Sequence, residues 1–221
     1  MLGQLNKISL EELKVKQKEI AKKVILKPLT KPIRYIAGID VGYDSEQDIA
    51  YPAIVILKYP ELKVIEEAII RCKVKFPYIP TFLSFREVPL ILEAFKKISI
   101  KPDLIMVDGQ GLAHPRKAGF AVHLGVILNL PTIGCAKKPL LKNFKEPKNK
   151  KGATSPIYLK NEIVGFVVRT KENVKPVYVS PGNLITFEEA IKFVLATVDK
   201  YRIPEPLRKA HNLSKKFKES S

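Results

Sequence analysis

The chain has 221 residues, which fits one domain with a full hydrophobic core, and it carries 39 Lys and Arg against 22 Asp and Glu, a formal net charge of +17. Its two cysteines have no metal-site spacing and no apolar run approaches the roughly 20 residues that span a bilayer, which excludes disulfide scaffolds and membrane proteins. The uncompensated positive charge favours a polyanionic partner such as nucleic acid, because contacts to phosphate then dominate affinity.

The first part of the chain predicts one helix and then three strands. Ser9 is the expected N-cap of a helix over residues 9–27, and Glu12 completes a capping box. Three strands are expected next, over residues 33–40, 50–57 and 64–74. Their short connections predict an antiparallel meander.

The rest of the chain predicts alternating helices and strands. A helix over 90–98, with Pro89 in its first turn, is followed by a strand over 104–107, a helix over 121–130 and a strand over 132–135. Residues 137–151 hold seven lysines and predict a surface loop. Residues 155–159 and 163–169 predict a hairpin, and Thr186 caps a last helix to residue 198, before a basic tail.

Three antiparallel strands followed by alternating helices and strands is the order of an RNase H-like domain. We therefore expect an α/β fold with a central mixed sheet, three antiparallel strands followed by parallel ones, flanked by helices. Residues 1–221 are predicted to form a single domain with a basic C-terminal tail.

Two of the predicted strands end in an aspartate. Asp40 follows the apolar run 35–39, and Asp108 follows the run 104–107. Parallel neighbouring strands lie roughly 4.8 Å apart, so these side chains would emerge side by side if the two strands are neighbours. Two carboxylates that close repel each other unless one takes up a proton or both bind a cation. Oxygen ligands of this kind suit Mg²⁺ or Mn²⁺.

The residues after Asp108 form a glycine-rich loop, Asp-Gly-Gln-Gly-Leu-Ala-His-Pro-Arg over 108–116. An Asp, a His and an Arg that converge on one turn suit metal-assisted chemistry on a phosphate. The alternative is a strand-to-helix connection whose glycines only satisfy the backbone geometry.

Four segments together resemble the endonuclease V family, the deoxyinosine 3′ endonucleases. They are Pro-Tyr-Ile-Pro…Phe-Arg-Glu over 77–87, the loop over 108–116, Gly-Cys-Ala-Lys-Lys-Pro-Leu over 134–140 and Val-Ser-Pro-Gly-Asn over 179–183. The resemblance runs in order from about residue 33 to the tail. It departs from the family at Asn183, where we would expect histidine, and this puts only the role of that side chain in doubt.

The resemblance implies an RNase H-like, Mg²⁺-dependent DNA repair endonuclease, with Mn²⁺ as a substitute for Mg²⁺. Its partner would be DNA that contains deoxyinosine, and it would hydrolyse the second phosphodiester bond 3′ to the lesion, leaving 3′-hydroxyl and 5′-phosphate ends. An alternative is an endoribonuclease that cuts inosine-containing RNA, because the same motifs occur in both kinds of enzyme.

The resemblance also implies roles for five catalytic residues. Asp40 and Asp108 would hold the metal, and Glu87 would be the third acidic residue. His114 would act near the cleaved phosphate in proton transfer or orientation, and Lys137 would stabilise the charge of the transition state. The alternative for Glu87 is a surface ion pair with its neighbour in the chain.

Tyr78 lies between two prolines, which predicts a rigid, exposed aromatic ring. The resemblance implies that it is a wedge that fills the space left by an extruded base, whereas the alternative is a core tyrosine in a turn. The extruded base would enter a pocket, and the residues predicted to shape it are Leu83, Gly109, Gly111, Gly119 and Leu140.

The remaining polar candidates have simpler expected roles. His123 is expected to cap or pack on a helix, His211 to lie in the tail and contact a phosphate, and Lys138 to contact phosphate without further specificity. We expect Cys72 and Cys135 to be reduced core residues of a cytoplasmic, monomeric protein that makes no membrane contact.

Two further classes of protein compete with this interpretation, and one other explanation competes for the positive charge. Residues 38–42, Gly-Ile-Asp-Val-Gly, faintly resemble the phosphate loop of actin-like ATP-binding domains, but the net charge and the segment around Tyr78 argue against that class. The acidic set disfavours a non-catalytic DNA-binding protein. A heat-adapted surface would also be Lys-rich, but it would mix both signs of charge rather than leave +17 uncompensated.

Overall fold

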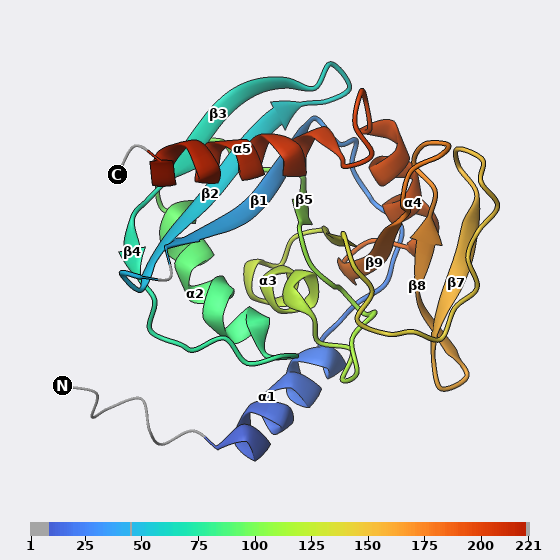
Figure 1. The fold of residues 1–221 in the computed structure, drawn as a ribbon, viewed down its shortest axis with the longest axis horizontal. Coiled ribbons are helices and arrows are strands. Elements are labelled where there is room, and N and C mark those ends of the chain that lie inside the picture. Colours follow the sequence, from blue (N-terminus) through green and yellow to red (C-terminus); the bar gives the residue numbers. More distant parts are fainter. Residues whose placement is uncertain (1–8, 45, 220–221) are drawn as a thin grey trace.

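The computed structural model describes residues 9–44 and 46–219, which form one mixed sheet with helices on both faces (Figure 1). The helices are α1 (Leu10–Lys22), α2 (Leu83–Phe95), α3 (Phe120–Leu128), α4 (Phe187–Ala196) and α5 (Glu205–Glu219). The strands are β1 (Tyr35–Asp44), β2 (Ile49–Lys58), β3 (Lys63–Ile69), β4 (Cys72–Lys73), β5 (Leu104–Val107), β6 (Thr132–Ala136), β7 (Thr154–Leu159), β8 (Glu162–Val168) and β9 (Val177–Asn183).

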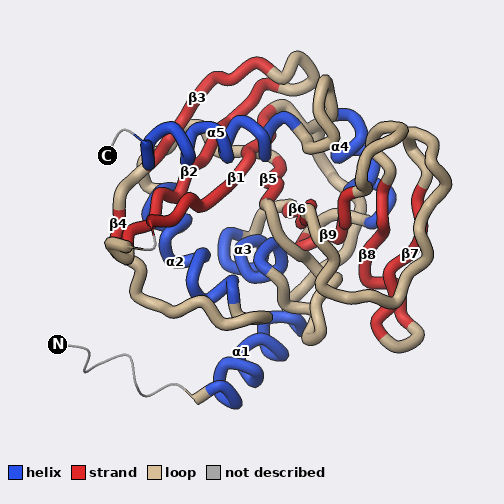
Figure 2. Tube along the Cα trace, in the orientation of Figure 1, coloured by secondary structure: helices blue, strands red, loops and turns tan. Residues whose placement is uncertain are grey.

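The order of the strands confirms the predicted fold class. Across the sheet the order is β3-β2-β1-β5-β6-β9-β8-β7, and β4 pairs with β2 (Figure 2). β1, β2 and β3 are antiparallel, and β5 and β6 then run parallel to β1. β9 returns antiparallel to β6, and the predicted hairpin of β7 and β8 extends the sheet beyond it.

Side-chain alternation along the central strands divides the core into two layers. On one face, Ile39 of β1 belongs to a cluster with Ile91 of α2 and Leu124 of α3. On the other face, Ile36 of β1 belongs to a cluster with Phe193 of α4, and α5 covers β1 and β2. Each central strand is therefore buried on both sides, and polar residues in it are confined to its end.

α5 crosses β1 and β2 at a point where β1 has no side chain (Figure 1). A Cβ atom at Gly38 would lie 1.9 Å from the carbonyl oxygen of Pro206, so only glycine permits this approach of the two backbones. A Cβ atom at Gly42 would lie 3.3 Å from Ser214 further along the same helix. The contact holds α5 close to the half of β1 that carries Asp40.

Two predicted helices have different bounds in the structure. α1 has the predicted capping box at Ser9 but ends at Lys22: the N–H groups of the next two residues bond only three residues back, and the Ile25 N–H donates outside the helix, to Asn183 Oδ1 at 3.0 Å. α2 begins seven residues earlier than predicted, and Pro89 lies inside it. Pro89 is exposed, so its ring lies on the solvent side of the helix.

Several strand predictions were also wrong in detail. β1 does not end at Asp40 but continues to Asp44 along β2. The strand predicted over 64–74 is two strands, β3 and β4. β9 was not predicted, because Pro181 and Gly182 disfavour a strand, and the basic tail is the helix α5.

One of the two cysteines lies in the core, as the sequence predicts, and the other does not. Both cysteines are free thiols; Cys135 is buried in β6, whereas Cys72 lies half-buried in the short strand β4 rather than in the core. His123 packs edge-on against Phe85, with ring centroids 5.1 Å apart, as its predicted place on a helix suggests. In residues 9–44 and 46–219, the helices are too short or too polar to cross a membrane.

Candidate active site

Asp40 and Asp108 lie on neighbouring parallel strands, as the sequence predicts. Ile39 of β1 pairs with Val107 of β5, so the residue after each of them emerges at the same level of the sheet. β5 ends there, whereas β1 continues along β2 alone, so the site opens where β1 loses its parallel partner. The two carboxylates repel each other, and the charge of Asp40 contributes to raising the pKa of Asp108.

Glu87 adds a third carboxyl group from the first half of α2. Its side chain is 7% exposed, and the Tyr43 hydroxyl donates a hydrogen bond to Glu87 Oε1 at 3.1 Å. Burial raises the pKa of Glu87 to about 8, Tyr43 opposes this rise, and the charges of Asp40 and Asp108 add to it. Glu87 is therefore part of one acidic cluster and not of a surface ion pair.

Lys137 forms an ion pair with Asp108, one member of the acidic cluster. It follows β6, the parallel neighbour of β5, and its Nζ lies 2.5 Å from Asp108 Oδ2. Burial raises the pKa of Asp108, and the bond and charge of Lys137 oppose that rise. Lys137 is partly exposed, so a negatively charged group that approaches Asp108 also meets this ammonium group.

α5 supplies two partners for Asp40, His211, which was predicted to lie in a tail, and Ser214, for which no role was predicted. Ser214 Oγ donates to Asp40 Oδ2 at 2.7 Å, and His211 Nδ1 lies 3.2 Å from the same oxygen. The expectation that His211 lies in a tail was therefore wrong. A signal was present, since the buried residues Leu207, Ala210 and Ser214 have the spacing of one helix face.

His114 is bound to the loop next to it rather than to the acidic cluster. Its Nε2 lies 3.0 Å from the Thr81 carbonyl oxygen, and its Nδ1 accepts a hydrogen bond from the Arg116 N–H at 3.1 Å. Burial lowers the pKa of His114 to about 4, so the ring is neutral near pH 7. The geometry gives His114 a positioning role, and the predicted proton transfer stays a prediction.

The carbonyl of Thr81 is the anchor of this loop. Besides His114, it accepts hydrogen bonds from Gln17 Nε2 at 2.7 Å and from an Arg116 nitrogen at 3.2 Å. Gln17 is a fully buried residue of α1, so the first helix of the fold ties down the segment that follows Tyr78. Tyr78 itself is 64% exposed, which agrees with the predicted rigid, exposed ring and not with a core tyrosine.

A cavity of about 440 Å³ has both Tyr78 and Asp108, one member of the acidic cluster, in its lining. Its lining includes Asp108 and Lys137, and four of the five residues predicted to shape a base pocket: Leu83, Gly109, Gly119 and Leu140. The fifth, Gly111, is not in the lining, and a Cβ atom there would lie 2.2 Å from the Pro181 carbonyl oxygen. Gly111 therefore permits the glycine loop to pack on β9. The volume lies within the range of small-molecule sites, roughly 300–1,000 Å³.

Asn183 has a structural role. It is 3% exposed, and its side chain accepts a hydrogen bond from the Ile25 N–H and donates one to the Gly125 carbonyl at 3.1 Å. The amide thereby joins the chain after α1 to α3, away from the carboxylates.

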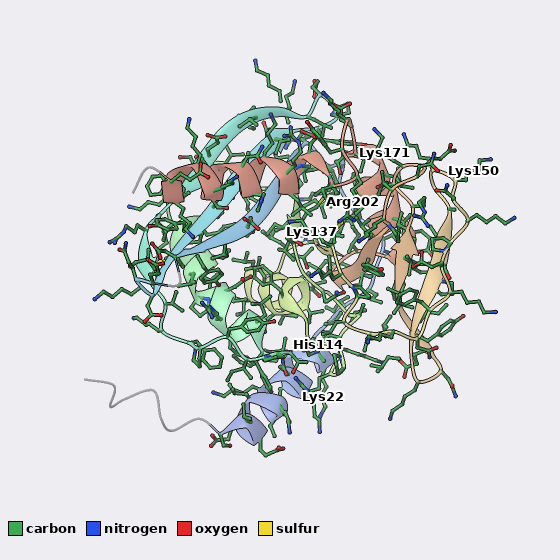
Figure 3. The ribbon with its side chains drawn as sticks, viewed as in Figure 1. Lys22, His114, Lys137, Lys150, Lys171 and Arg202 are labelled. Carbon is green, nitrogen blue, oxygen red and sulfur yellow. The ribbon has the colours of Figure 1, made fainter. Side chains whose placement is uncertain are left out.

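The lysine-rich loop after Lys137 is anchored by its apolar residues. Leu141 and Phe144 pack on the cluster below the loop, and Phe144 stacks near Tyr178 with centroids 5.5 Å apart. Most of its lysines are exposed. Figure 3 shows Lys137 near the centre of the molecule and Lys150 at its outer edge, beside β7. The exposed lysines of the loop thus form a basic surface that extends away from the acidic cluster.

The acidic cluster has the donor types of a metal site. Asp40 and Asp108 offer oxygen ligands, of which Asp108 lines the cavity, and the raised pKa values of Asp108 and Glu87 reflect burial and crowded negative charge that a cation would relieve. Across the part of the chain that the structure describes, however, no three His, Cys, Asp or Glu residues form a closed metal cage. Two protein ligands with open positions resemble a Mg²⁺ site rather than a structural metal site.

Known proteins resemble this chain over nearly its whole length. The family model of endonuclease V matches residues 18–212. An endonuclease V of Dictyoglomus thermophilum is 52% identical over 200 residues, which cover 90% of this chain and 87% of that protein. The crystal structure of endonuclease V from Streptomyces avermitilis has a TM-score of 0.90 at 39% identity and covers 96% of this chain and 94% of that chain.

A third comparison includes a nucleic acid. An endonuclease V variant of Ciona intestinalis, in complex with a 23mer DNA that contains an inosine followed by a ribo-adenosine, has a TM-score of 0.86 at 30% identity. The match covers 96% of this chain and 99% of that chain. With the family model and these relatives matching almost all of its length, the chain belongs to the endonuclease V family and is a nuclease.

Proposed function

We propose that this protein is a Mg²⁺-dependent DNA repair endonuclease that recognises deoxyinosine and hydrolyses the second phosphodiester bond 3′ to it, leaving 3′-hydroxyl and 5′-phosphate ends. The observation that carries the proposal is the cavity of about 440 Å³, whose lining includes both the exposed Tyr78 and Asp108 of the acidic cluster. An extruded base in this cavity would hold its own strand beside the acidic cluster.

Asp40 and Asp108 would hold the Mg²⁺, for which Mn²⁺ could substitute, and Glu87 would add negative charge behind them. When bound, the cation supplies activation of water and neutralises charge on the scissile phosphate. Hydrogen bonds from Ser214 and His211 to Asp40 Oδ2 fix that carboxylate in one orientation.

The side chains around the carboxylates supply the remaining chemistry. Lys137 Nζ, beside Asp108, stabilises the negative charge that builds on the phosphate oxygens. His211 is half-exposed with Nδ1 directed at Asp40, so its Nε2 can exchange the proton that the departing 3′-oxygen requires. His114 positions the Thr81 loop and stays neutral.

The test of this function is a cleavage assay with mapped product ends. Matched duplexes that carry hypoxanthine or adenine at one position, and the matched RNA strands, are incubated with the protein and Mg²⁺. We expect one nick in the hypoxanthine DNA, at the second bond on the 3′ side, and none in the adenine DNA. Faster cleavage of the RNA would favour the endoribonuclease alternative, and equal cleavage of hypoxanthine and adenine DNA would reject the proposal.

Replacing Tyr78 by alanine is expected to weaken binding to inosine-containing duplex roughly tenfold, because stacking is worth about 1–3 kcal/mol per base. Tyr78 is exposed, and the loop is held by hydrogen bonds to the Thr81 carbonyl oxygen rather than by the Tyr78 side chain. The fold should therefore be unaffected. Base extrusion is easier from a single strand, where the defect should be smaller. Binding measured side by side on the two substrates tests this, and equal defects would argue against a wedge.

Neutralising Lys145, Lys148 and Lys150 with glutamine is expected to weaken binding equally on inosine-containing and plain duplex. All three side chains are exposed on the lysine-rich loop. If each contacts a phosphate, the slope of log affinity against log salt concentration falls by about 0.9 per contact. A salt titration of the variant and the wild type measures it, and an unchanged slope would show that the loop does not contact DNA.

A further inference from the structure

Two polar atoms in the wall of the cavity have no hydrogen-bond partner in the protein. They are Ser84 Oγ and Gln110 Oε1, both buried, and neither bonds with any residue of the described chain. Both residues line the cavity that contains Asp108. Buried polar atoms are nearly always satisfied, because an unmatched one opposes folding, so two of them in residues that line one cavity lack a partner that the described chain does not supply.

The orientation of the Gln110 amide is fixed from its other end. Gln110 Nε2 donates to the Lys138 carbonyl oxygen at 3.0 Å, which leaves Oε1 as the atom without a partner. The backbone is held as well, since the Gln110 carbonyl accepts from the Ala121 N–H at 3.0 Å. The cavity therefore has a fixed acceptor that cannot become a donor without breaking the bond to Lys138.

Ser84 contributes a hydroxyl from the first turn of α2. The side chain is 2% exposed, and it does not make the bond to a preceding helix carbonyl that serines in helices often make. The helix begins after Phe82, which has no side-chain oxygen to cap it. The Ser84 hydroxyl can donate or accept, in contrast to Gln110 Oε1.

We propose that Ser84 and Gln110 read the lactam edge of the extruded base, an inference that rests on the proposed function. Hypoxanthine has a carbonyl oxygen at C6, which accepts from the Ser84 hydroxyl, and an N1–H group, which donates to Gln110 Oε1. Adenine has an amino group at C6 and an unprotonated N1. In the same pose its N1 lone pair faces the oxygen of Gln110, and this contact is repulsive.

The two residues have different roles in this arrangement. The Ser84 hydroxyl can turn to accept from the adenine amino group, so Ser84 contributes affinity for both bases. Gln110 Oε1 cannot adapt, so Gln110 contributes the preference for hypoxanthine over adenine.

The test compares Ser84→Ala and Gln110→Met with the wild type, with Ser155→Ala as a control at a buried serine in β7. Binding is measured without divalent metal, on single strands that carry hypoxanthine, adenine or unsubstituted purine at one position. Purine has neither the carbonyl nor the N1–H group. Each of the two variants should bind hypoxanthine about tenfold more weakly. Ser84→Ala should bind purine as the wild type does, and Gln110→Met should bind purine as well as the wild type or more tightly, because the lone pair of purine N1 also faces Gln110 Oε1. Only Gln110→Met should reduce the ratio of hypoxanthine to adenine affinity.

Stability measurements separate this role from a structural one. The Ser84 hydroxyl has no partner in the protein, so Ser84→Ala should melt at the wild-type temperature or above it. Equal losses on hypoxanthine and purine, or undiminished hypoxanthine affinity in both variants, would overturn the proposal while the proposed function stands. A wild type that binds the three bases equally would overturn both.

Discussion

Replacing Asp40 or Asp108 by alanine is expected to reduce nicking by roughly three orders of magnitude or more, because each change removes an oxygen ligand and a charge that hold the cation. The cavity and Tyr78 are not altered, so binding to inosine-containing DNA should persist. The loss should not come from unfolding. In metal-free buffer, removing one carboxylate relieves its repulsion with the other acidic groups but also removes the bonds of Asp40 to α5 or the ion pair of Asp108 with Lys137, so both variants should stay folded with a modest change in melting temperature.

Single-turnover cleavage over a range of Mg²⁺ concentrations, with thermal melting on the same samples, measures both effects. Asp40→Asn and Asp108→Asn are the matched controls, because they keep the shape and remove the charge. Turnover within tenfold of the wild type at any Mg²⁺ concentration would contradict the assignment of these residues to the metal.

Replacing Lys137 by methionine is expected to slow the cleavage step about 100-fold, the size of effect seen when one preorganised donor to a developing oxyanion is lost. The aliphatic part of the side chain is kept and the ammonium group beside Asp108 is removed. Lys137→Arg keeps the charge and should restore part of the rate. Binding to DNA should change little, because many other cations of the surface remain.

Lys138→Met is the matched control for Lys137. The neighbouring lysine is exposed, and its backbone carbonyl, which binds Gln110, is not changed by the substitution. Comparing single-turnover rates and dissociation constants of the three variants separates chemistry from binding. A rate loss of the same size in Lys137→Met and Lys138→Met would mean that both act only through general charge.

The sequence predicts the centre of the fold and of the site because both depend on short apolar runs. Strand β5 and the half of β1 that pairs with it are short apolar runs, and each run is followed by an aspartate, Asp108 and Asp40. Ser9 and Thr186 cap helices where predicted, since a capping box is local in sequence.

The predictions fail where tertiary contacts override local signals. Pro89 reads as a helix start, but α2 tolerates it on its exposed side, so Glu87 was not recognised as helical. Pro181 and Gly182 are typical of a loop, so β9 was not predicted, although the strand is buried between β6 and β8. The hydrogen-bond partners in the cavity wall depend on residues far apart in the chain, and no spacing rule reveals them.

The basic composition of the last segment also concealed its role. Its many lysines suggest a solvated tail, yet the buried residues Leu207, Ala210 and Ser214 define a helix face that docks on β1. His211 was therefore predicted to contact phosphate at a distance from the carboxylates, whereas the structure places it on Asp40. The lysine-rich composition predicted a tail, whereas the helical spacing of the apolar residues predicts the docked helix that the structure contains.

The docking of α5 has a consequence for the order in which the nuclease matures. Asp40 is joined to residues that lie 171 and 174 positions later in the chain. During synthesis the sheet and both of the aspartates proposed to bind the metal precede α5, so a nascent chain that stops before Glu205 has the carboxylates without His211 and Ser214. Translation thus delays completion of the cutting centre until the last helix has closed over β1, and a ribosome-bound fragment carries an unfinished active site.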